Sequence, residues 1–318
     1  MSHAEPQSGG RSEREEALRR AKRLEWATFL FTVSSVTLTF FVLGGSQAMQ
    51  TAWIEDLLSM VPPVAFLITT QIARRPATRK YPYGYHRAST VAHLVSASAL
   101  TVVGAFLIFD GASVLLASEH PPIGTIELFG HGIWQGWVMI AAMAYGGSVP
   151  AVLGRMKLKP AATLHDKAVY ADADMNKAEW KTAAAAIVGI VGIGLGLWWA
   201  DAVAAMVISL SIIRDGITNL RGSVRDLMDG EATTVDNSAP LPLTQQVHDQ
   251  VIGTPWVQDA RIRIRDMGQR FSIDARVKAE PHHTFTTADI RDLRREIEKL
   301  DETIHDVTIT PLTDLPGQ

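Results

Sequence analysis

Six apolar segments occupy the first two thirds of the chain, and each is long enough to cross a lipid bilayer. They lie at about residues 27–43, 52–72, 91–116, 134–153, 172–199 and 201–220. A transmembrane helix needs roughly 20 predominantly apolar residues. Most of the tryptophans lie near the ends of these segments, where indole rings favour the membrane interface. The pattern predicts an α-helical membrane protein with six transmembrane helices.

The pattern changes after Asp229, where the apolar segments end. Apolar and polar residues alternate over 261–265 and 271–277, which predicts two half-buried strands. A helical stretch around Val247 precedes them; a helix over 287–300 and a last strand around Val307 follow. The order α-β-β-α-β predicts a small α+β layer domain. The expected domains are a tail at 1–23, a membrane domain at 24–229, a linker at 230–242 and a small domain at 243–318.

Lys and Arg residues are distributed unevenly among the connections between the apolar segments. They occur in the N-terminal tail, between the second and third segments, between the fourth and fifth, and after the sixth. The alternate connections, 44–51, 117–133 and 199–201, contain neither. Positive residues favour the cytoplasmic side. We therefore expect a multi-pass protein of the inner (plasma) membrane with both termini in the cytoplasm.

Composition narrows the function. With 47% hydrophobic residues the chain is more apolar than a typical soluble protein of this length, and a net charge of −3 argues against a nucleic-acid partner. The absence of Cys excludes disulfides and thiolate metal sites. No phosphate-binding loop, dinucleotide fingerprint, nucleophile elbow or zinc-protease motif is present. We expect neither an enzyme nor a resident cofactor.

Acidic residues in two apolar segments are the candidate chemistry. Asp172, Met175, Asn176 and Glu179 share one face of the fifth segment. In the second segment, Glu55 and Ser59 are one helical turn apart, and Asp56 lies beside them. Oxygen ligands from two crossing helices suit a hard divalent cation such as Mn²⁺ or Mg²⁺. The carboxylates would take up protons when the cation leaves.

Structural roles are the alternative for these acids. Glu55 and Asp56 would then cap the outer end of the second segment in water. Each acid of the fifth segment would pair with a cation nearby: Asp172 and Asp174 with Lys167 and Lys177, and Glu179 with Lys177 or Lys181. We favour a functional role for Glu179, since acids inside a membrane are usually functional. Pro62 and Pro63 would break or bend the second helix.

Two features of the C-terminal region have mainly structural interpretations. His282 and His283 are adjacent in a Pro-containing turn, and an exposed pair is favoured over a metal site because closed sites need three or four ligands. A basic stripe lies on the predicted strands: Arg261, Arg263, Arg265, Arg276 and Lys278. Interspersed acids favour a solvated face or a dimer contact, although nucleic acid or lipid headgroups remain open.

From about residue 24 to 311, the chain resembles the cation diffusion facilitator family of divalent metal transporters. Two local matches carry the resemblance. Residues 81–88, Tyr-Pro-Tyr-Gly-Tyr-His-Arg-Ala, look like the family's His-Pro-Phe-Gly-type loop before its third span. Ala-Asp-Ala at 171–173 and at 200–202 match the starts of its fifth and sixth spans.

The resemblance implies a homodimer that exchanges cytoplasmic metal for protons by alternating access. The family's transport site is Asp-x-x-x-Asp in span two and His-x-x-x-Asp in span five, which carries over to Glu55, Ser59, Met175 and Glu179. The changed residues disfavour a tetrahedral Zn²⁺ site. The family's cytoplasmic metal sites correspond here to Arg261, Ala275 and Thr310, so none is expected.

The sequence thus predicts an efflux transporter of divalent metal cations, working as a metal/proton antiporter and a homodimer. Its fold is six transmembrane helices with a ferredoxin-like α+β cytoplasmic domain. Glu55 and Glu179 are the principal metal and proton ligands; Ser59, Met175 and Asn176 assist, and Asp172 lies at the cytoplasmic mouth. Mn²⁺ or Fe²⁺ is favoured over Zn²⁺. The alternative is a transport-inactive family member that serves as a binding or assembly partner.

Overall fold

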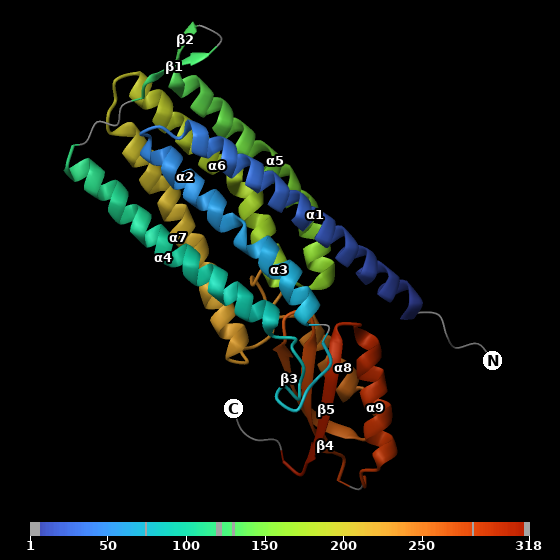
Figure 1. Ribbon diagram of the computed structural model, residues 1–318. Helices are drawn as coiled ribbons and strands as arrows, with labels where there is room; N and C mark the ends of the chain where they lie inside the picture. The colour runs from blue at the N-terminus through green and yellow to red at the C-terminus, as the bar shows by residue number, and fades with distance from the viewer. Residues whose placement is uncertain (1–6, 74, 119–122, 129–130, 282, 315–318) are drawn as a thin grey trace.

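A helical bundle and a small sheet domain make up the protein (Figure 1). The computed structural model describes residues 7–73, 75–118, 123–128, 131–281 and 283–314. The first helix begins, and the last bundle helix ends, at the end of the bundle next to the sheet domain (Figure 1). At the opposite end, strands β1 (Thr125–Leu128) and β2 (His131–Trp134) pair as an antiparallel hairpin.

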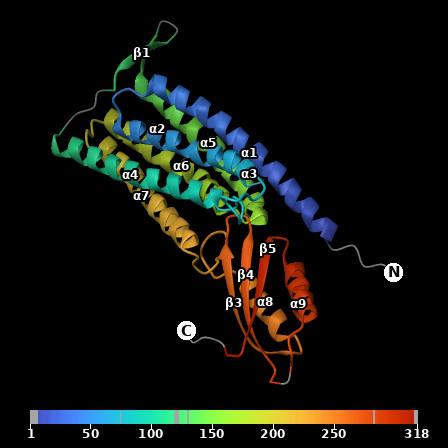
Figure 2. The same cartoon turned by 60° about the horizontal axis from the view of Figure 1, so that its bottom comes forward.

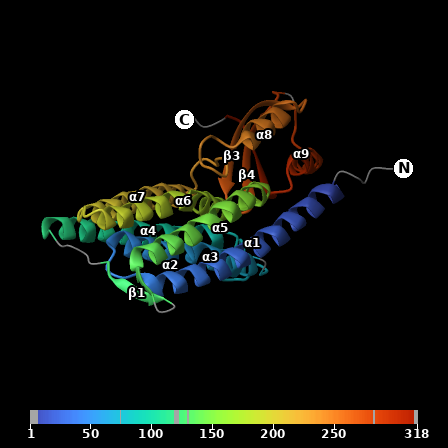
Figure 3. The same cartoon turned by 90° about the horizontal axis from the view of Figure 1, so that it is seen from above.

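The bundle helices run side by side with roughly aligned axes (Figure 3). They are α1 (Gln7–Val42), α2 (Gln47–Ser59), α3 (Val61–Ile72), α4 (Ala88–Leu116), α5 (Gln135–Leu164), α6 (Lys167–Gly194) and α7 (Ala200–Leu227). By length and composition, Glu13–Val42, Gln47–Ile72, Ala88–Leu116 and Gln135–Leu164 are able to cross a membrane. Helices α6 and α7 carry more charged residues, and they pack chiefly against α5 and α4. The mostly helical membrane architecture is confirmed, and the count of six spans stays a prediction.

The second predicted span consists of two helices, α2 and α3. The break at Met60 follows from Pro62 and Pro63, which lie in the first turn of α3, where no intrahelical N–H bond is required. Ser46 caps α2, accepting a hydrogen bond from the Met49 N–H at 3.1 Å. This cap starts the helix before the apolar stretch begins, so Glu55 lies two turns inside α2. The expectation that Glu55 caps the span in water was wrong.

Small residues let the bundle helices approach one another closely. A Cβ added to Gly154 of α5 would lie 2.4 Å from the backbone nitrogen of Lys177 on α6. Added at Gly192 or Gly189 of α6, it would lie 2.4 Å from the Cβ of Ala200 or 2.9 Å from that of Ala204 on α7. Gly189 and Gly192 therefore have a packing role. Because α5, α6 and α7 approach so closely, polar side chains on them come within reach of one another.

The C-terminal domain has the predicted order of elements. They are α8 (Pro242–Ile252), β3 (Val257–Asp266), β4 (Phe271–Ala279), α9 (Thr287–Leu300) and β5 (Ile304–Leu312). Strand β4 pairs antiparallel with β3 and parallel with β5, and both helices cover one face of the sheet (Figure 2). Alternate residues of β4, such as Ile273 and Val277, pack with Val247 of α8 and Ile297 of α9. A ferredoxin-like fold stays a prediction.

The predicted basic stripe is a face of mixed charge. The Arg276 Nε lies 3.5 Å from Asp274 Oδ2, and the Arg265 Nη1 lies 3.8 Å from Asp229 Oδ2. In the register of the sheet, Arg263 lies opposite Asp274. Acids thus accompany the arginines of this face, as a solvated surface requires.

His283 belongs to the local packing at the start of α9. Its ring stacks on Trp256 at 5.5 Å, and its Nε2 lies 3.1 Å from Asp289 Oδ2. Asp289 also forms a capping box with Thr286 at the N-terminus of α9. His283 therefore has a structural environment, and His282 lies outside the described residues.

Candidate functional site

Three acids lie together where α2 contacts α6, and we call them the carboxyl cluster: Glu55, Asp56 and Glu179. Glu55 and Asp56 are the nearest charged neighbours of Glu179, and the carboxyl groups of Asp56 and Glu179 adjoin each other. Ser35 of α1 donates a hydrogen bond to Asp56 Oδ2 at 3.0 Å. The hydroxyl group of Thr182 lies beside Glu55. Two of the acids predicted from spacing, Glu55 and Glu179, are therefore brought together, and Asp56 joins them.

The carboxyl cluster has no fixed counter-cation. Glu55 and Glu179 are 7% and 8% exposed, and within the described part of the chain none of the three acids forms an ion pair. Glu55 Oε2 is buried without a hydrogen-bond partner among the described residues. Ionised carboxylates this close in a poorly solvated site repel one another strongly. Protons or a bound cation must therefore compensate their charge.

Among the described residues no lysine pairs with Glu179, so the alternative of a structural ion pair for this acid does not hold. Lys177 Nζ lies 2.5 Å from Asp174 Oδ1, which confirms the predicted pair at the exposed helix surface. Lys181 lies near Asp215 of α7 instead. The nearest charged neighbours of Glu179 are therefore acids.

Two further predicted ligands, Ser59 and Met175, lie at the same helix contact without completing a metal centre. Ser59 is buried one turn below Glu55, and its hydroxyl group donates to the Asp56 carbonyl oxygen at 2.8 Å. Met175 lies one turn from Glu179, packed against the bundle core. In the ranges that the structure describes, no group of three or more His, Asp or Glu side chains is arranged to hold a metal ion. The site has ligands of the right kind but is not a preassembled centre.

A second group of buried charges contains a lysine that is shared by two carboxylates, and we call it the lysine cluster: Lys157 of α5, Glu25 of α1, and Asp172 and Asn176 of α6. Lys157 Nζ donates to Glu25 Oε2 at 2.9 Å and to Asp172 Oδ2 at 2.5 Å. Asn176 Nδ2 donates to the same Asp172 oxygen at 2.9 Å. The Lys157 and Glu25 side chains are 0% and 1% exposed. The cluster therefore ties three helices together.

The lysine cluster corrects the expected partner of Asp172. That partner is Lys157 rather than Lys167, because the close approach of α5 and α6 near Gly154 brings Lys157 to Asp172. The sequence analysis missed both Lys157 and Glu25 as partners. The available signal was a lysine and a glutamate within helices that are otherwise apolar enough to span a membrane.

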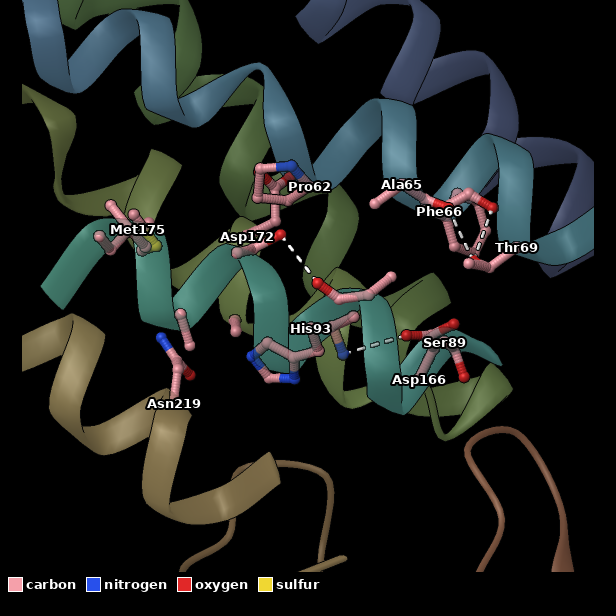
Figure 4. A pocket seen from close by; sticks show the side chains of 16 residues that line it. Pro62, Ala65, Phe66, Thr69, Ser89, His93, Asp166, Asp172, Met175 and Asn219 are labelled. Atoms are coloured by element: carbon pink, nitrogen blue, oxygen red, sulfur yellow. Dashed lines mark hydrogen bonds between the residues drawn. The ribbon is translucent and has the colours of Figure 1, made fainter. Parts of the chain in front are cut away.

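A small cavity of about 20 Å³ lies within the bundle (Figure 4). Its walls come from α3, α4, α6 and α7. It is lined by Pro62, Ala65, Phe66, Thr69, Ser89, Ala92, His93, Ser96, Ala97, Leu100, Asp166, Ala168, Ala171, Asp172, Met175 and Asn219. Met175, one turn from Glu179, marks its inner end, and Asp166, the N-cap of α6, marks its outer end. The cavity thus leads from the domain junction towards the carboxyl cluster.

The turn between β3 and β4 contacts the end of the bundle, and we call this contact the domain junction. Lys167 Nζ lies 2.9 Å from Asp226 Oδ1 of α7 and 3.0 Å from Asp266 Oδ2 of β3. Gln269 Nε2 donates to Asp166 Oδ2 at 2.6 Å. Burial raises the pKa of Asp266, but the hydrogen bond with His165 and the charge of Lys167 outweigh it, so its pKa lies below the usual value. Asp266 is therefore an anion that holds the two parts together.

A second, smaller cavity, of about 10 Å³, lies within the domain junction. Gly268 of the β3–β4 turn forms part of its wall, and a Cβ there would lie 2.4 Å from Ser89 Oγ of α4. Ser89, His93 and Asp166 line both cavities. The two cavities are therefore neighbours that share a wall.

Two histidines meet beside the domain junction. The His86 ring, in the loop before α4, lies 4.4 Å from the His305 ring of β5 in an edge-to-face arrangement. Burial lowers the pKa of each imidazole, and His305 and Arg270 lower that of His86 further. Both rings are thus held in the neutral state to a lower pH than usual.

The cation-handling features described above agree with comparisons to known proteins. Residues 26–228 match the cation efflux transmembrane domain. The chain belongs to the cation efflux family. The resemblance to the cation diffusion facilitator family is thereby confirmed, and the protein is a metal cation transporter of this family rather than an enzyme.

Three relatives match this chain over more than three quarters of its length. The manganese efflux system protein MneS of Bacillus subtilis (strain 168) is 27% identical over 270 residues, which cover 84% of this chain and 85% of the relative. The magnetosome protein MamB of Paramagnetospirillum magneticum is 23% identical over 266 residues, covering 82% and 83%. The probable cation efflux system protein Rv2025c of Mycobacterium tuberculosis is 24% identical over 248 residues, covering 77% and 68%.

Proposed function

We propose that this protein exports a divalent metal cation from the cytoplasm in exchange for protons, at the carboxyl cluster between α2 and α6. The observation that carries the proposal is the meeting of three acids, the buried Glu55 and Glu179 and the half-buried Asp56, with no counter-cation among the described residues. Glu55 and Glu179 are the principal metal and proton ligands. Ser59 and Met175 complete the shell from the same two helices.

Charge balance explains the exchange. A divalent cation that enters the carboxyl cluster compensates the negative charge, so the acids release their protons. When the cation leaves, the buried carboxylates take up protons again, because an uncompensated charge there is costly. The same groups therefore bind metal and protons alternately, which is the minimum requirement for antiport.

Asp172 and Asn176 precede Glu179 on α6, by about two turns and one turn, and support this site from there. Asp172 lies in the wall of the larger cavity, at the cytoplasmic mouth, where Lys157 already compensates its charge. Asn176 holds the Asp172 carboxylate in place. In this assignment the two residues shape the approach to the carboxyl cluster.

The donor set favours Mn²⁺ or Fe²⁺ as the transported ion. Carboxylate and hydroxyl oxygens suit these cations, and the thioether of Met175 adds one softer ligand. Zn²⁺ is less suited, since it prefers imidazole or thiolate ligands and position 175 supplies neither. The names of the relatives, a manganese efflux system protein and a magnetosome protein, agree with this choice.

Six spans, with α2 and α3 together forming the second, are part of the proposal. The axes of α6 and α7 are aligned with those of the four helices able to cross a membrane (Figures 1 and 3). Lys and Arg gather in the connections at the end that carries the C-terminal domain. We place that end, both termini and a ferredoxin-like domain in the cytoplasm, and the protein as a homodimer in the plasma membrane.

Metal uptake into proteoliposomes under a pH gradient tests the proposal. The panel is Mn²⁺, Fe²⁺, Co²⁺, Zn²⁺, Cd²⁺ and Mg²⁺, with wild type beside Glu55→Gln, Glu179→Gln and the control Asp174→Asn. Asp174 is exposed and pairs only with Lys177 among the described residues. We expect Mn²⁺ or Fe²⁺ uptake that both glutamate variants reduce at least about 100-fold and the control retains.

One observation favours a second candidate, a transport-inactive partner in an assembly. The described residues contain no preassembled group of three metal-binding side chains. Failure of folded, dimeric wild-type protein to move any of the six metals would support that candidate and reject the transporter.

A further inference from the structure

His93 of α4 is a buried histidine that the carboxyl cluster does not use. Its side chain lines the larger cavity (Figure 4) and also the cavity of the domain junction. Its Nε2 atom is buried and has no hydrogen-bond partner among the residues that the structure describes. Polar atoms buried in proteins are nearly always paired, so an unpaired nitrogen in a cavity wall points to an absent ligand.

The surroundings of His93 supply further donor atoms, and the charges nearest to it are paired with each other. The amide side chain of Asn219 on α7 adjoins the imidazole ring (Figure 4). Asp226 and Lys167 are the charged groups nearest to the ring. Met175 lies in the wall of the same cavity. A cation beside Nε2 would therefore have an amide oxygen and, deeper in the cavity, a thioether within the same enclosure.

We propose that His93 is a transit ligand for the transported divalent cation on its way from the cytoplasm to the carboxyl cluster. Neutral imidazole binds Mn²⁺, Fe²⁺ and Zn²⁺. Here Nε2 takes one position in the shell of the cation as it passes the cavity wall. The imidazole that position 175 lacks on α6 is thus supplied from α4, at an earlier point on the path.

A single protein ligand suits transit because a cation held by one imidazole is released easily. The position of His93 fits this role, since it lies in the wall shared by two neighbouring cavities, one at the domain junction and one ending at Met175. The inference rests on the proposed function, because it takes the carboxyl cluster as the destination of the cation.

Transport kinetics test the role of His93 in the full-length protein. His93→Ala and His93→Gln are compared with Ser98→Ala, a residue of α4 that lines neither cavity and donates to the Leu94 carbonyl group at 2.8 Å. We expect the KM for Mn²⁺ to rise about tenfold in both His93 variants, with the maximal rate changed less than about twofold. A purely structural histidine would lower the maximal rate and the folded fraction instead. An unchanged KM overturns the proposal.

A labelling experiment makes the test independent of transport. Because the chain has no Cys, His93→Cys introduces a unique thiol. Reaction with a small methanethiosulfonate reagent is measured in detergent with and without Cd²⁺, with Ser98→Cys as the control. We expect Cd²⁺ to slow labelling at position 93 at least about fivefold and to leave position 98 unchanged. Equal rates with and without Cd²⁺ at position 93 overturn the proposal.

The kinetic and labelling experiments distinguish failure of the transit ligand from failure of the proposed function. Wild-type transport with an unchanged KM in the His93 variants rejects the transit ligand and leaves the proposed function intact. Absence of wild-type transport together with Cd²⁺ protection at position 93 rejects the proposed function and supports cation entry into the cavity.

Discussion

Helix α6 contributes one acid to each of the two clusters. Asp172 and Glu179 lie two turns apart on this helix, and their charges are compensated in different ways. Asp172 shares Lys157 with Glu25, so a fixed ammonium group lies between the two carboxylates. Glu179 adjoins Glu55 and Asp56, and no lysine or arginine pairs with them within the described ranges. The lysine cluster carries its own cation, whereas the carboxyl cluster needs one from outside.

This difference assigns a role to each group. A permanent cation makes the lysine cluster a joint between α1, α5 and α6, because neither carboxylate is free to exchange its partner. The carboxyl cluster is able to bind protons or a metal ion in turn, since nothing in the described protein occupies it permanently. We propose that the two acids of α6, Asp172 and Glu179, thereby take a structural and a transport role, respectively.

Removing the lysine should have the largest effect on stability. Lys157→Met leaves Glu25 and Asp172 buried without a cation, which costs about 3–5 kcal/mol. We expect a markedly lower unfolding temperature in detergent. By contrast, Glu55→Gln and Glu179→Gln remove repulsion and should keep or raise that temperature.

A triple variant separates the loss of the lysine charge from the loss of its packing. Lys157→Met combined with Glu25→Gln and Asp172→Asn removes all three charges, and most of the lost stability should return. If Lys157→Met alone unfolds like wild type, the lysine cluster is not the joint described above.

A smaller effect is expected where the C-terminal domain meets the bundle. Burial keeps the pKa values of His86 and His305 below the ordinary 6.5, and undocking would restore that value. Between the lowered values and 6.5, the undocked state binds more protons, so docking is strongest above pH 6.5 and weakens as pH falls through this window.

Spin labels on Tyr83→Cys and Thr308→Cys, both exposed positions, would report the distance across this contact. We expect the population with the longer distance to grow as pH falls below 6.5. His305→Gln should flatten the dependence. A distance that is independent of pH in wild type would show that these imidazoles do not contribute to docking.

Local patterns predicted much of this protein. Alternation of apolar residues located β3 and β4, the paired prolines located the break between α2 and α3, and helical spacing placed Glu55 and Glu179 at facing positions. Each of these features depends on residues within a few positions of one another or on a recognisable motif.

Such local patterns did not predict which charged residues pair with one another. Lys157 meets Glu25 across 132 positions of sequence, and this pairing depends on which helices are neighbours and how each is rotated. Lipid-facing and protein-facing surfaces are both apolar, so hydrophobic periodicity does not fix that rotation. The early start of α2 depends on the Ser46 cap, outside the apolar stretch, and the expected capping role of Glu55 failed for that reason.

The most direct test of the central claim is proton release when Mn²⁺ binds to the purified protein in weakly buffered detergent solution. Wild type, Glu179→Gln and the control Asp174→Asn are titrated with Mn²⁺ while pH is recorded. We expect proton release with wild type and the control, and clearly less proton release with Glu179→Gln. Mn²⁺ binding without proton release, or equal release from Glu179→Gln, would contradict the assignment of the carboxyl cluster as the site of exchange.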